Sequence, residues 1–219
     1  KANIFFYERK TRVEVPLTSA FALQLCPDVS QDGERFLFQS STASGKLEGS
    51  IMAGFTRSGN QPVPIVPDGI DAKWAPDGKT LAFVRPSAPS FELWKVSLTE
   101  KNETRLATGL LLNGFNDKPF NFVATNFSWA PGGDRIVYAS TESGRRNLRV
   151  VSSDGKTNTL LTSSTDDKLK LTSPLWSRDG NSVAYISEPL KYSAVGSRDV
   201  CMVQQEKART LSSYKTRFR

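Results

Sequence analysis

The stretch WAPDGKTLAFV, residues 74–84, decides the fold of this chain. A tryptophan leads into Ala75-Pro76-Asp77-Gly78, and an apolar run follows at once. Proline presets φ at the second position of a turn, aspartate suits the third, and glycine accepts a positive φ at the fourth. Such a turn joins two antiparallel strands. The run after it is apolar at consecutive positions, which predicts a strand packed on both faces between neighbouring sheets.

The same pattern occurs three more times. It returns in WAPGGDRIVYA (129–139) and WSRDGNSVAYI (176–186), and a weaker copy, VSQDGERFLFQ (29–39), carries Val29 in place of the tryptophan. The turn glycines lie at positions 33, 78, 133 and 180, at intervals of 45, 55 and 47 residues. A period of about 40–50 residues is typical of the blades of a β-propeller.

A second hairpin follows each of these units. Its clearest copy is NLRVVSSDGKTNTLLT (147–162), where Asp154-Gly155 forms the turn. Two hairpins make a four-stranded blade, and blades arranged radially make a propeller. The sequence therefore predicts an all-β fold, a β-propeller of four-stranded antiparallel blades with four complete repeats and a partial N-terminal blade.

Residues 1–219 are predicted to form a single propeller domain. The segment NIFFYERKTRVEVPLT (3–18) matches the outer hairpin of a blade that lacks its inner hairpin. We interpret the chain as an excised or truncated part of a longer propeller; the alternative is a ring that closes irregularly with this hairpin. The predicted complete blades are 24–67, 71–108, 126–163 and 173–212.

The three copies with tryptophan resemble the W-x-P-D-G repeats of the TolB-type, WD-repeat-like β-propeller family, and the resemblance covers nearly the whole chain. Gln31 and Arg178 stand where that family has the turn proline, and Gly132 stands where it has the turn aspartate. These departures affect the rigidity of the turns more than the fold.

The resemblance implies a non-catalytic module that binds protein or peptide partners outside the cytoplasm, in the periplasm or at the cell surface. Such a module is TolB-like or the sensor domain of a bacterial regulator. The alternative is the gating propeller of a prolyl-oligopeptidase-type serine peptidase whose catalytic domain is absent from this chain. Propellers host many activities, so the repeats predict the fold better than the function.

The composition excludes several enzyme classes. The chain has 219 residues, a net charge of +7 and no histidine. Ser-His-Asp and Cys-His catalysis and histidine-ligated zinc or iron are therefore excluded, and no G-x-S-x-G elbow occurs. We predict that the chain is not an enzyme and binds no cofactor or metal. A glycosidase that uses only carboxylates as catalytic groups remains an alternative. No apolar run is long enough to insert into a membrane.

The recurring aspartates and tryptophans have structural explanations. The aspartates at the third turn position are predicted to bond the backbone of their own turns, with calcium binding or catalysis as the alternative. They are Asp32, Asp77 and Asp179. The tryptophans before the turns are predicted to pack between blades. They are Trp74, Trp129 and Trp176.

The connections between hairpins are the predicted binding surface, because they vary in length and gather on one face of a propeller. The longest, residues 108–126, either folds its apolar groups over a blade or contacts a partner with aromatic anchors. Its neighbours carry positive charges, which are either solvated or steer an acidic protein or peptide. Nucleic acid is not predicted, since no dense basic run with interleaved aromatic residues occurs. The candidate partner-binding residues are Phe115, Lys118, Phe120, Phe122, Arg85, Arg145, Arg146, Lys191 and Arg198.

Overall fold

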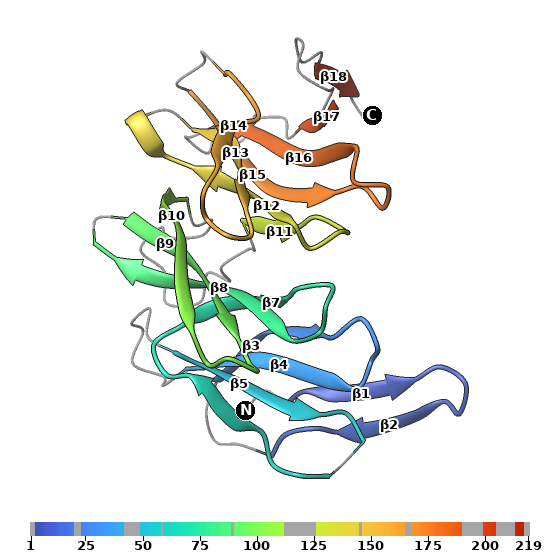
Figure 1. Cartoon of the computed structure of the whole chain (residues 1–219). Helices are drawn as coiled ribbons and strands as arrows, with labels where there is room; N and C mark the ends of the chain where they lie inside the picture. Colours follow the sequence, from blue (N-terminus) through green and yellow to red (C-terminus); the bar gives the residue numbers. More distant parts are fainter. Residues whose placement is uncertain are drawn as a thin grey trace. The chain divides into compact units, whose positions relative to one another are not determined.

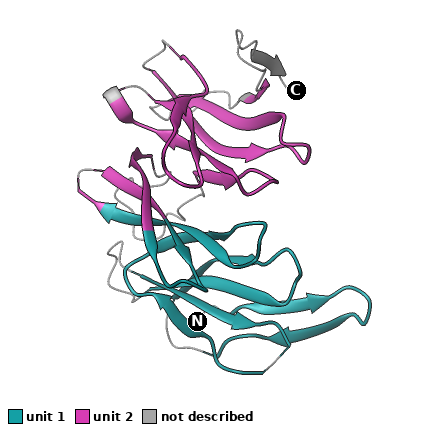
Figure 2. Cartoon of the chain, in the orientation of Figure 1, with its two compact units in different colours: residues 1–86, 95–103, 118–120 teal, residues 87–94, 104–117, 121–219 magenta. Residues whose placement is uncertain are grey.

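A computed structural model gives the fold of the chain, and it divides the chain into two compact units (Figure 2). Unit 1 takes in the described residues up to Pro86 together with Lys95–Glu103. Unit 2 takes in Ser87–Trp94 and the described residues from Thr104 onward. The structure describes residues 3–19, 23–41, 49–57, 59–88, 90–111, 126–144, 146–164, 168–189, 199–204 and 213–216.

The chain begins with a two-stranded hairpin and a four-stranded sheet (Figure 1). The hairpin pairs β1 (Phe5–Glu8) with β2 (Val13–Pro16) antiparallel. The sheet has the strand order β3-β4-β5-β6. Its strands are β3 (Leu23–Val29), β4 (Arg35–Ser41), β5 (Ser50–Phe55) and β6 (Val63–Val66).

The predicted blades 71–108 and 126–163 join in one sheet, with the order β14-β13-β12-β10-β9-β8-β7 and with β11 paired to β12. The joining pair is Leu110 and Ser140. A 3-10 turn, η1 (Glu142–Gly144), lies between β12 and β13. The strands are β7 (Ile70–Trp74), β8 (Thr80–Ser87), β9 (Ser90–Ser97), β10 (Glu103–Leu110), β11 (Phe127–Trp129), β12 (Arg135–Ser140), β13 (Asn147–Ser152) and β14 (Asn158–Leu160).

The last sheet is again antiparallel and four-stranded, in the order β15-β16-β17-β18. Its strands are β15 (Leu169–Trp176), β16 (Ser182–Pro189), β17 (Asp199–Gln204) and β18 (Ser213–Thr216). The pairings within β3–β6 and within β15–β18 are all antiparallel, and each joins strands that are consecutive in the chain. The all-β antiparallel prediction is confirmed.

The four predicted turns have the predicted geometry. Gly33, Gly78, Gly133 and Gly180 have φ angles of 74°, 62°, 70° and 71°. The N–H of each glycine donates to the carbonyl oxygen three residues earlier, at 2.8–3.0 Å. The turn and its left-handed glycine thus close each hairpin as the sequence indicated.

The turn aspartates bond their own turns, which confirms their structural interpretation. Asp77 Oδ1 accepts hydrogen bonds from the backbone N–H groups of Lys79 and Thr80, both at 2.8 Å. Asp32 and Asp179 each accept one from the residue two positions further on. The hydrogen bonds donated by Ser30 to Asp32 and by Ser177 to Asp179 lower the pKa of each carboxyl.

The first strand of three repeats contains a bulge that the sequence did not predict. Cys26, Asp71 and Ser173 have φ angles of 51°, 45° and 51°, and the register with the following strand shifts at each of them. Each lies seven residues before its turn glycine. A bulge adds one residue to one strand and bends it. Every such repeat therefore has two fixed backbone points, a bulge and a turn.

The strands that follow the first three turns are buried, as predicted, whereas in the fourth Val183 and Tyr185 are buried and Ala184 and Ile186 are half-buried. Residues 36–38, 81–84 and 136–139 are all buried, and the largest fully buried side chains include Tyr138, Phe36 and Phe83. Trp74 and Trp176 are buried as well, whereas Trp129 is half-buried. Burial of these apolar side chains stabilises the strands that carry them.

Two arginines connect the turn of one repeat to the turn of the next. In unit 1, Arg35 Nη1 donates to Gly78 O at 2.8 Å. In unit 2, Arg135 Nη2 donates to Gly180 O at 3.3 Å, and its guanidinium carbon lies 4.9 Å from the centroid of the Trp176 ring. A cation over an indole ring adds electrostatic attraction to the packing.

Candidate functional site

Two of the nine candidate partner-binding residues lie in the described part of the chain. Arg146 is half-buried, next to the start of β13. Arg85 Nη2 lies 2.6 Å from Asp68 Oδ1 and 3.1 Å from Glu103 Oε2. Burial disfavours its charge, but these hydrogen bonds raise the pKa of Arg85. The candidates outside the described residues are Phe115, Lys118, Phe120, Phe122, Arg145, Lys191 and Arg198.

A pocket in unit 1 is the site that the structure adds. It lies between the β1–β2 hairpin and the end of β5 with the turn that follows, and its volume is about 580 Å³. Pockets that hold small ligands usually measure roughly 300–1,000 Å³. We call it the hairpin pocket. It is lined by Phe6, Glu8, Val13, Val15, Pro16, Leu17, Thr18, Ser19, Phe55, Thr56, Arg57, Gly59, Asn60 and Gln61.

The wall formed by the hairpin follows from its register. Phe6 faces Val15 and Glu8 faces Val13 across the two strands, so these four side chains share one face. Leu17, two residues beyond Val15, continues that face into the pocket. Val13 is 50% exposed and Val15 is 41% exposed. The wall is therefore apolar and open to solvent.

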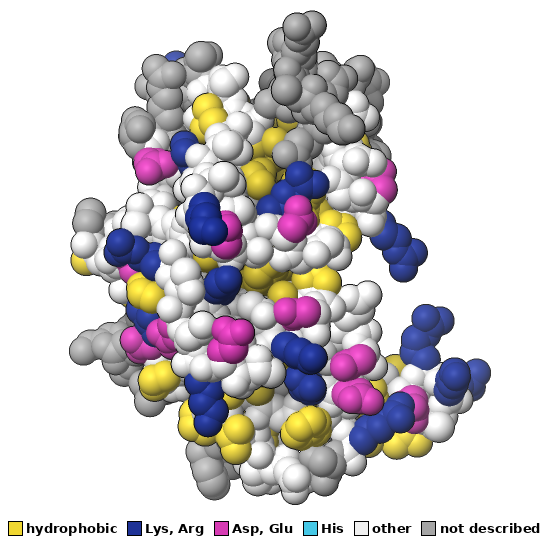
Figure 3. All heavy atoms as spheres, viewed as in Figure 1, with side chains coloured by type: hydrophobic (Ala, Val, Ile, Leu, Met, Phe, Trp, Pro, Cys, Tyr) yellow, Lys and Arg dark blue, Asp and Glu magenta, His cyan; other side chains and the backbone are white. Residues whose placement is uncertain are grey.

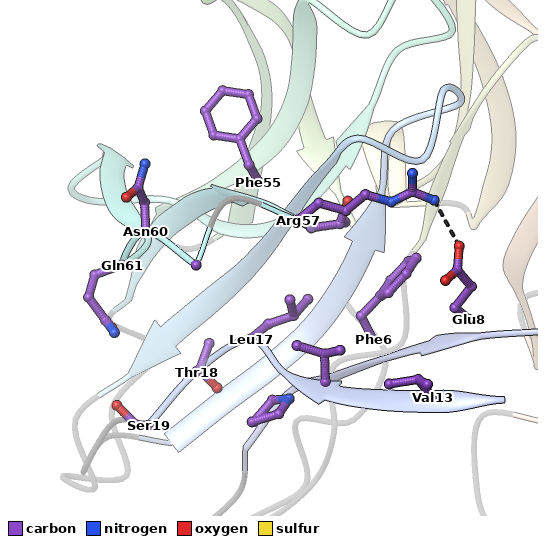
Figure 4. Close-up of a pocket in the computed structure, with 14 residues that line it drawn as sticks. Phe6, Glu8, Val13, Leu17, Thr18, Ser19, Phe55, Arg57, Asn60 and Gln61 are labelled. Carbon is purple, nitrogen blue, oxygen red and sulfur yellow. Dashed lines mark hydrogen bonds and ion pairs between the residues drawn. The ribbon is translucent and has the colours of Figure 1, made fainter. Parts of the chain in front are cut away.

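The opposite wall is the end of β5 and the turn before β6. Thr56 holds it in place, because the buried Thr56 hydroxyl donates to Gly33 O at 2.8 Å, in the turn between β3 and β4. Phe55 and Arg57 are the neighbours of Thr56 along the chain, and Figure 4 shows the Arg57 side chain directed toward Glu8 of the hairpin. Phe55 also lines the pocket and is 53% exposed, and its ring points away from the hairpin residues in Figure 4.

One ion pair joins the two walls. Arg57 Nη2 lies 2.9 Å from Glu8 Oε1 (Figure 4), and the Thr11 hydroxyl donates to the other oxygen of Glu8 at 2.9 Å. The Arg57 side chain is 76% exposed. Exposed ion pairs contribute only about 0–1 kcal/mol, so the pair closes the pocket weakly.

The base of the hairpin is held more firmly. The buried Thr18 Oγ1 accepts a hydrogen bond from Ile4 N at 3.0 Å and donates one to Gln24 Oε1 at 2.5 Å. These bonds tie the residues that flank the hairpin to β3. The hairpin pocket is thus fixed at one end and open along its apolar sides.

The lining of the hairpin pocket is mainly apolar, with a few polar groups. Its lining offers apolar surface, hydroxyl and amide groups, and one carboxylate that is already paired with Arg57. In the described part of the chain, no group of three or more His, Cys, Asp or Glu side chains could hold a metal ion. No helix among the described residues has the length and apolarity needed to cross a membrane.

The sequence contains a pattern that indicates this apolar wall. Val13, Val15 and Leu17 alternate with other residues, which is the pattern of a strand with one apolar face. The sequence does not show that the turn beyond β5 packs against that face, because the two are far apart along the chain; Glu8 and Arg57, which form an ion pair, are 49 residues apart.

Comparison with known proteins shows which solved structures share this fold. No protein-family model matches the chain, and no curated protein matches it in sequence. TolB from Acinetobacter baumannii superimposes with a TM-score of 0.65 at 13% identity, over 97% of this chain and 48% of that one. The putative TolB from Agrobacterium tumefaciens gives 0.58 at 17% identity, over 97% of this chain and 88% of that one.

A propeller from a peptidase is similar as well. The β-propeller domain of the Trilobed protease from Pyrococcus furiosus gives a TM-score of 0.59 at 13% identity, over 92% of this chain and 58% of that one. The chain spans about half the length of the Acinetobacter TolB chain. Its fold is therefore a TolB-like β-propeller fold, as the repeats predicted.

Proposed function

We propose that this chain is a non-catalytic β-propeller module that binds protein or peptide partners outside the cytoplasm, in the manner of TolB-like propellers. The observation that carries the proposal is the hairpin pocket, an open apolar cavity of about 580 Å³ on a hairpin whose apolar side chains are half exposed. Exposed apolar surface of this kind marks sites of protein interaction. The TolB-type resemblance supports the extracytoplasmic setting.

The variable connections are the second part of the proposed surface. Phe115, Phe120 and Phe122 would provide aromatic anchors, and the basic residues of the connections would attract acidic groups of the partner. Replacing residues 112–125, the part of this connection that lies outside the described residues, with a short Gly/Ser linker should therefore weaken capture of a partner while keeping β10 and its pairing with β12. Unchanged capture by the replaced chain would remove this connection from the binding surface.

The test of the binding module is selection of peptides from a displayed random library on the purified chain. We expect enrichment of apolar peptides, with affinity about tenfold weaker for Val15→Asp, which places a charge on the apolar wall. Val63→Asp is the matched control, because Val63 is 59% exposed on β6 and does not line the pocket. A folded chain that enriches no peptide would contradict the proposal.

A second candidate is the gating propeller of a serine peptidase, supported by the similarity to the Trilobed protease propeller. The complete gene separates the two functions. A coding sequence that continues into an α/β-hydrolase domain with a G-x-S-x-G elbow would favour the peptidase. A coding sequence with a signal peptide and no such domain would favour the binding module.

A further inference from the structure

The β1–β2 hairpin has open edges. Among the described strands, β1 and β2 pair only with each other. Leu17 N donates to Ile4 O at 2.8 Å, and bonded and non-bonded pairs alternate along an antiparallel ladder. The bonded pairs are therefore Ile4 with Leu17, Phe6 with Val15 and Glu8 with Val13. It follows that the backbone N–H and C=O groups of Phe5 and Tyr7 point outward along the edge of β1.

The two edges are not equivalent. By the same alternation, the edge of β2 presents Glu14 and Pro16, and proline has no N–H to donate. The edge of β1 keeps every donor and acceptor, and its side chains are apolar and exposed, with Phe5 at 51% and Tyr7 at 56%. An unpaired edge of this kind is a template for another strand.

Positive charge lies at one end of this edge. Arg9, Lys10 and Arg12, in the turn between β1 and β2, are all exposed. Figure 3 shows Lys and Arg side chains gathered over this end of the hairpin. The nearest carboxylate on β1, Glu8, is already paired with Arg57. The turn therefore attracts acidic groups at the end of any strand that pairs with β1.

We infer that the edge of β1 accepts an extended segment of a partner protein as a third strand, with acidic residues beside the β1–β2 turn and alternating apolar residues along Phe5 and Tyr7. Side chains on one face of the added strand cover Phe5 and Tyr7. Side chains on the other face extend past Phe6 toward the hairpin pocket. The inference rests on the proposed function and names the chemistry of the partner.

Two synthetic peptides test it, acetyl-DEDVTVFV-amide and acetyl-KKKVTVFV-amide, with binding measured by fluorescence anisotropy. We expect the acidic peptide to bind at least about tenfold more tightly than the lysine peptide, with the preference shrinking as salt is added. Saturation with the acidic peptide should slow hydrogen exchange at the amides of Phe5 and Tyr7, which the third strand would cover.

Proline substitutions on the two edges form a matched pair. Tyr7→Pro removes an outward N–H from β1 and should weaken the acidic peptide at least about tenfold. Glu14→Pro removes the corresponding N–H from β2 and should leave the affinity within about twofold. If Tyr7→Pro does not fold, Lys10→Glu replaces it, with Lys156→Glu as its control because the Lys156 side chain is 82% exposed in unit 2.

The outcomes separate this inference from the proposed function. Binding that Tyr7→Pro and Glu14→Pro weaken equally, or not at all, overturns strand addition while the binding module stands. If displayed peptides bind but the acidic peptide does not, only this inference fails; if no peptide binds, both fail. Self-association of the chain that Tyr7→Pro abolishes, with no peptide bound, would identify a second copy as the occupant and overturn the inference.

Discussion

Gly78 holds a backbone conformation that side chains resist. Its φ is +62°, and a Cβ at this position would meet only Asp32 Oδ2, at 3.9 Å. Gly78→Ala should therefore lower the free energy of unfolding through backbone strain alone, by about 1–2 kcal/mol in urea denaturation. Gly132→Ala, in the turn of the next repeat and without a positive φ, is the control. Equal effects of the two substitutions would contradict the explanation.

Asp154 links the stability of a turn to pH. The hydrogen bond from Ser152, followed by that from Lys156 N, lowers the pKa of Asp154 to about 2. The same carboxyl in an unfolded chain titrates near about 3.9. A folded pKa below the unfolded one means that the stabilisation is complete above the unfolded value and is lost as the pH falls toward the folded value.

We therefore expect Asp154→Asn to be less stable than the unmodified chain at neutral pH, and the difference should disappear as the pH falls to about 2. Urea unfolding across this range measures it. Glu14→Gln, on the exposed hairpin, controls for the loss of one carboxylate. A difference for Asp154→Asn that stays constant with pH would show that the charge of Asp154 is not responsible.

At the scale of elements, Thr56 fixes the wall of the hairpin pocket that β5 provides. Its buried hydroxyl donates to Gly33 O, and Thr56 N donates to Glu34 O at 2.9 Å. Thr56→Val keeps the shape and removes the hydrogen bond to the carbonyl of the half-buried Gly33, so the free energy of unfolding should fall by about 0.5–1.5 kcal/mol. Binding of peptides to the pocket should weaken in parallel. Thr99→Val, at an exposed turn, should change neither quantity.

Elements that depend on a few consecutive residues were predictable from the sequence. Elements that depend on pairing with residues far along the chain were not. The turns at Gly33 and Gly180 follow from four consecutive residues, so their geometry was visible in the sequence even without the turn proline. The bulges at Cys26 and Asp71 were missed, because left-handed backbone at cysteine or aspartate arises from pairing with the next strand and has no distinctive composition.

In the hairpin pocket, one wall was predictable from the local sequence and the opposite wall was not. The alternation of Val13, Val15 and Leu17 was present in the sequence, and it predicts one apolar face. The opposite wall depends on the hydrogen bond from Thr56 to Gly33, across 23 residues, which the sequence does not reveal. Of the predicted binding residues, Arg85 is engaged with Asp68 and Glu103, a pairing that spacing alone did not suggest.

At the scale of the whole molecule, the net charge of +7 has a kinetic consequence. A positive protein attracts acidic partners over the Debye length, which shortens from about 30 Å at 0.01 M salt to about 8 Å at 0.15 M. Association of the acidic peptide should slow over this range in stopped-flow measurements, while its dissociation changes less. Equal salt dependence for the lysine peptide would contradict steering by the charge of the chain.

The propeller fold was predictable because the same sequence repeat occurs four times in the chain. Each copy places a turn, an apolar strand and a second hairpin in the same order, so one local pattern specified the blades. The joining of β10 to β12 through Leu110 and Ser140 was not predictable, since it depends on a single residue pair between two repeats.

In three of the four repeats the bulge and the turn glycine lie at a constant distance from each other along the chain. Between Cys26 and Gly33, Asp71 and Gly78, and Ser173 and Gly180 the separation is the same, whereas the connections elsewhere differ in length. Inserting or deleting one residue inside this interval would turn every later side chain of the strand to its other face. Insertions are therefore expected only outside the interval between the bulge and the turn glycine, so divergent repeats are best aligned on these two positions.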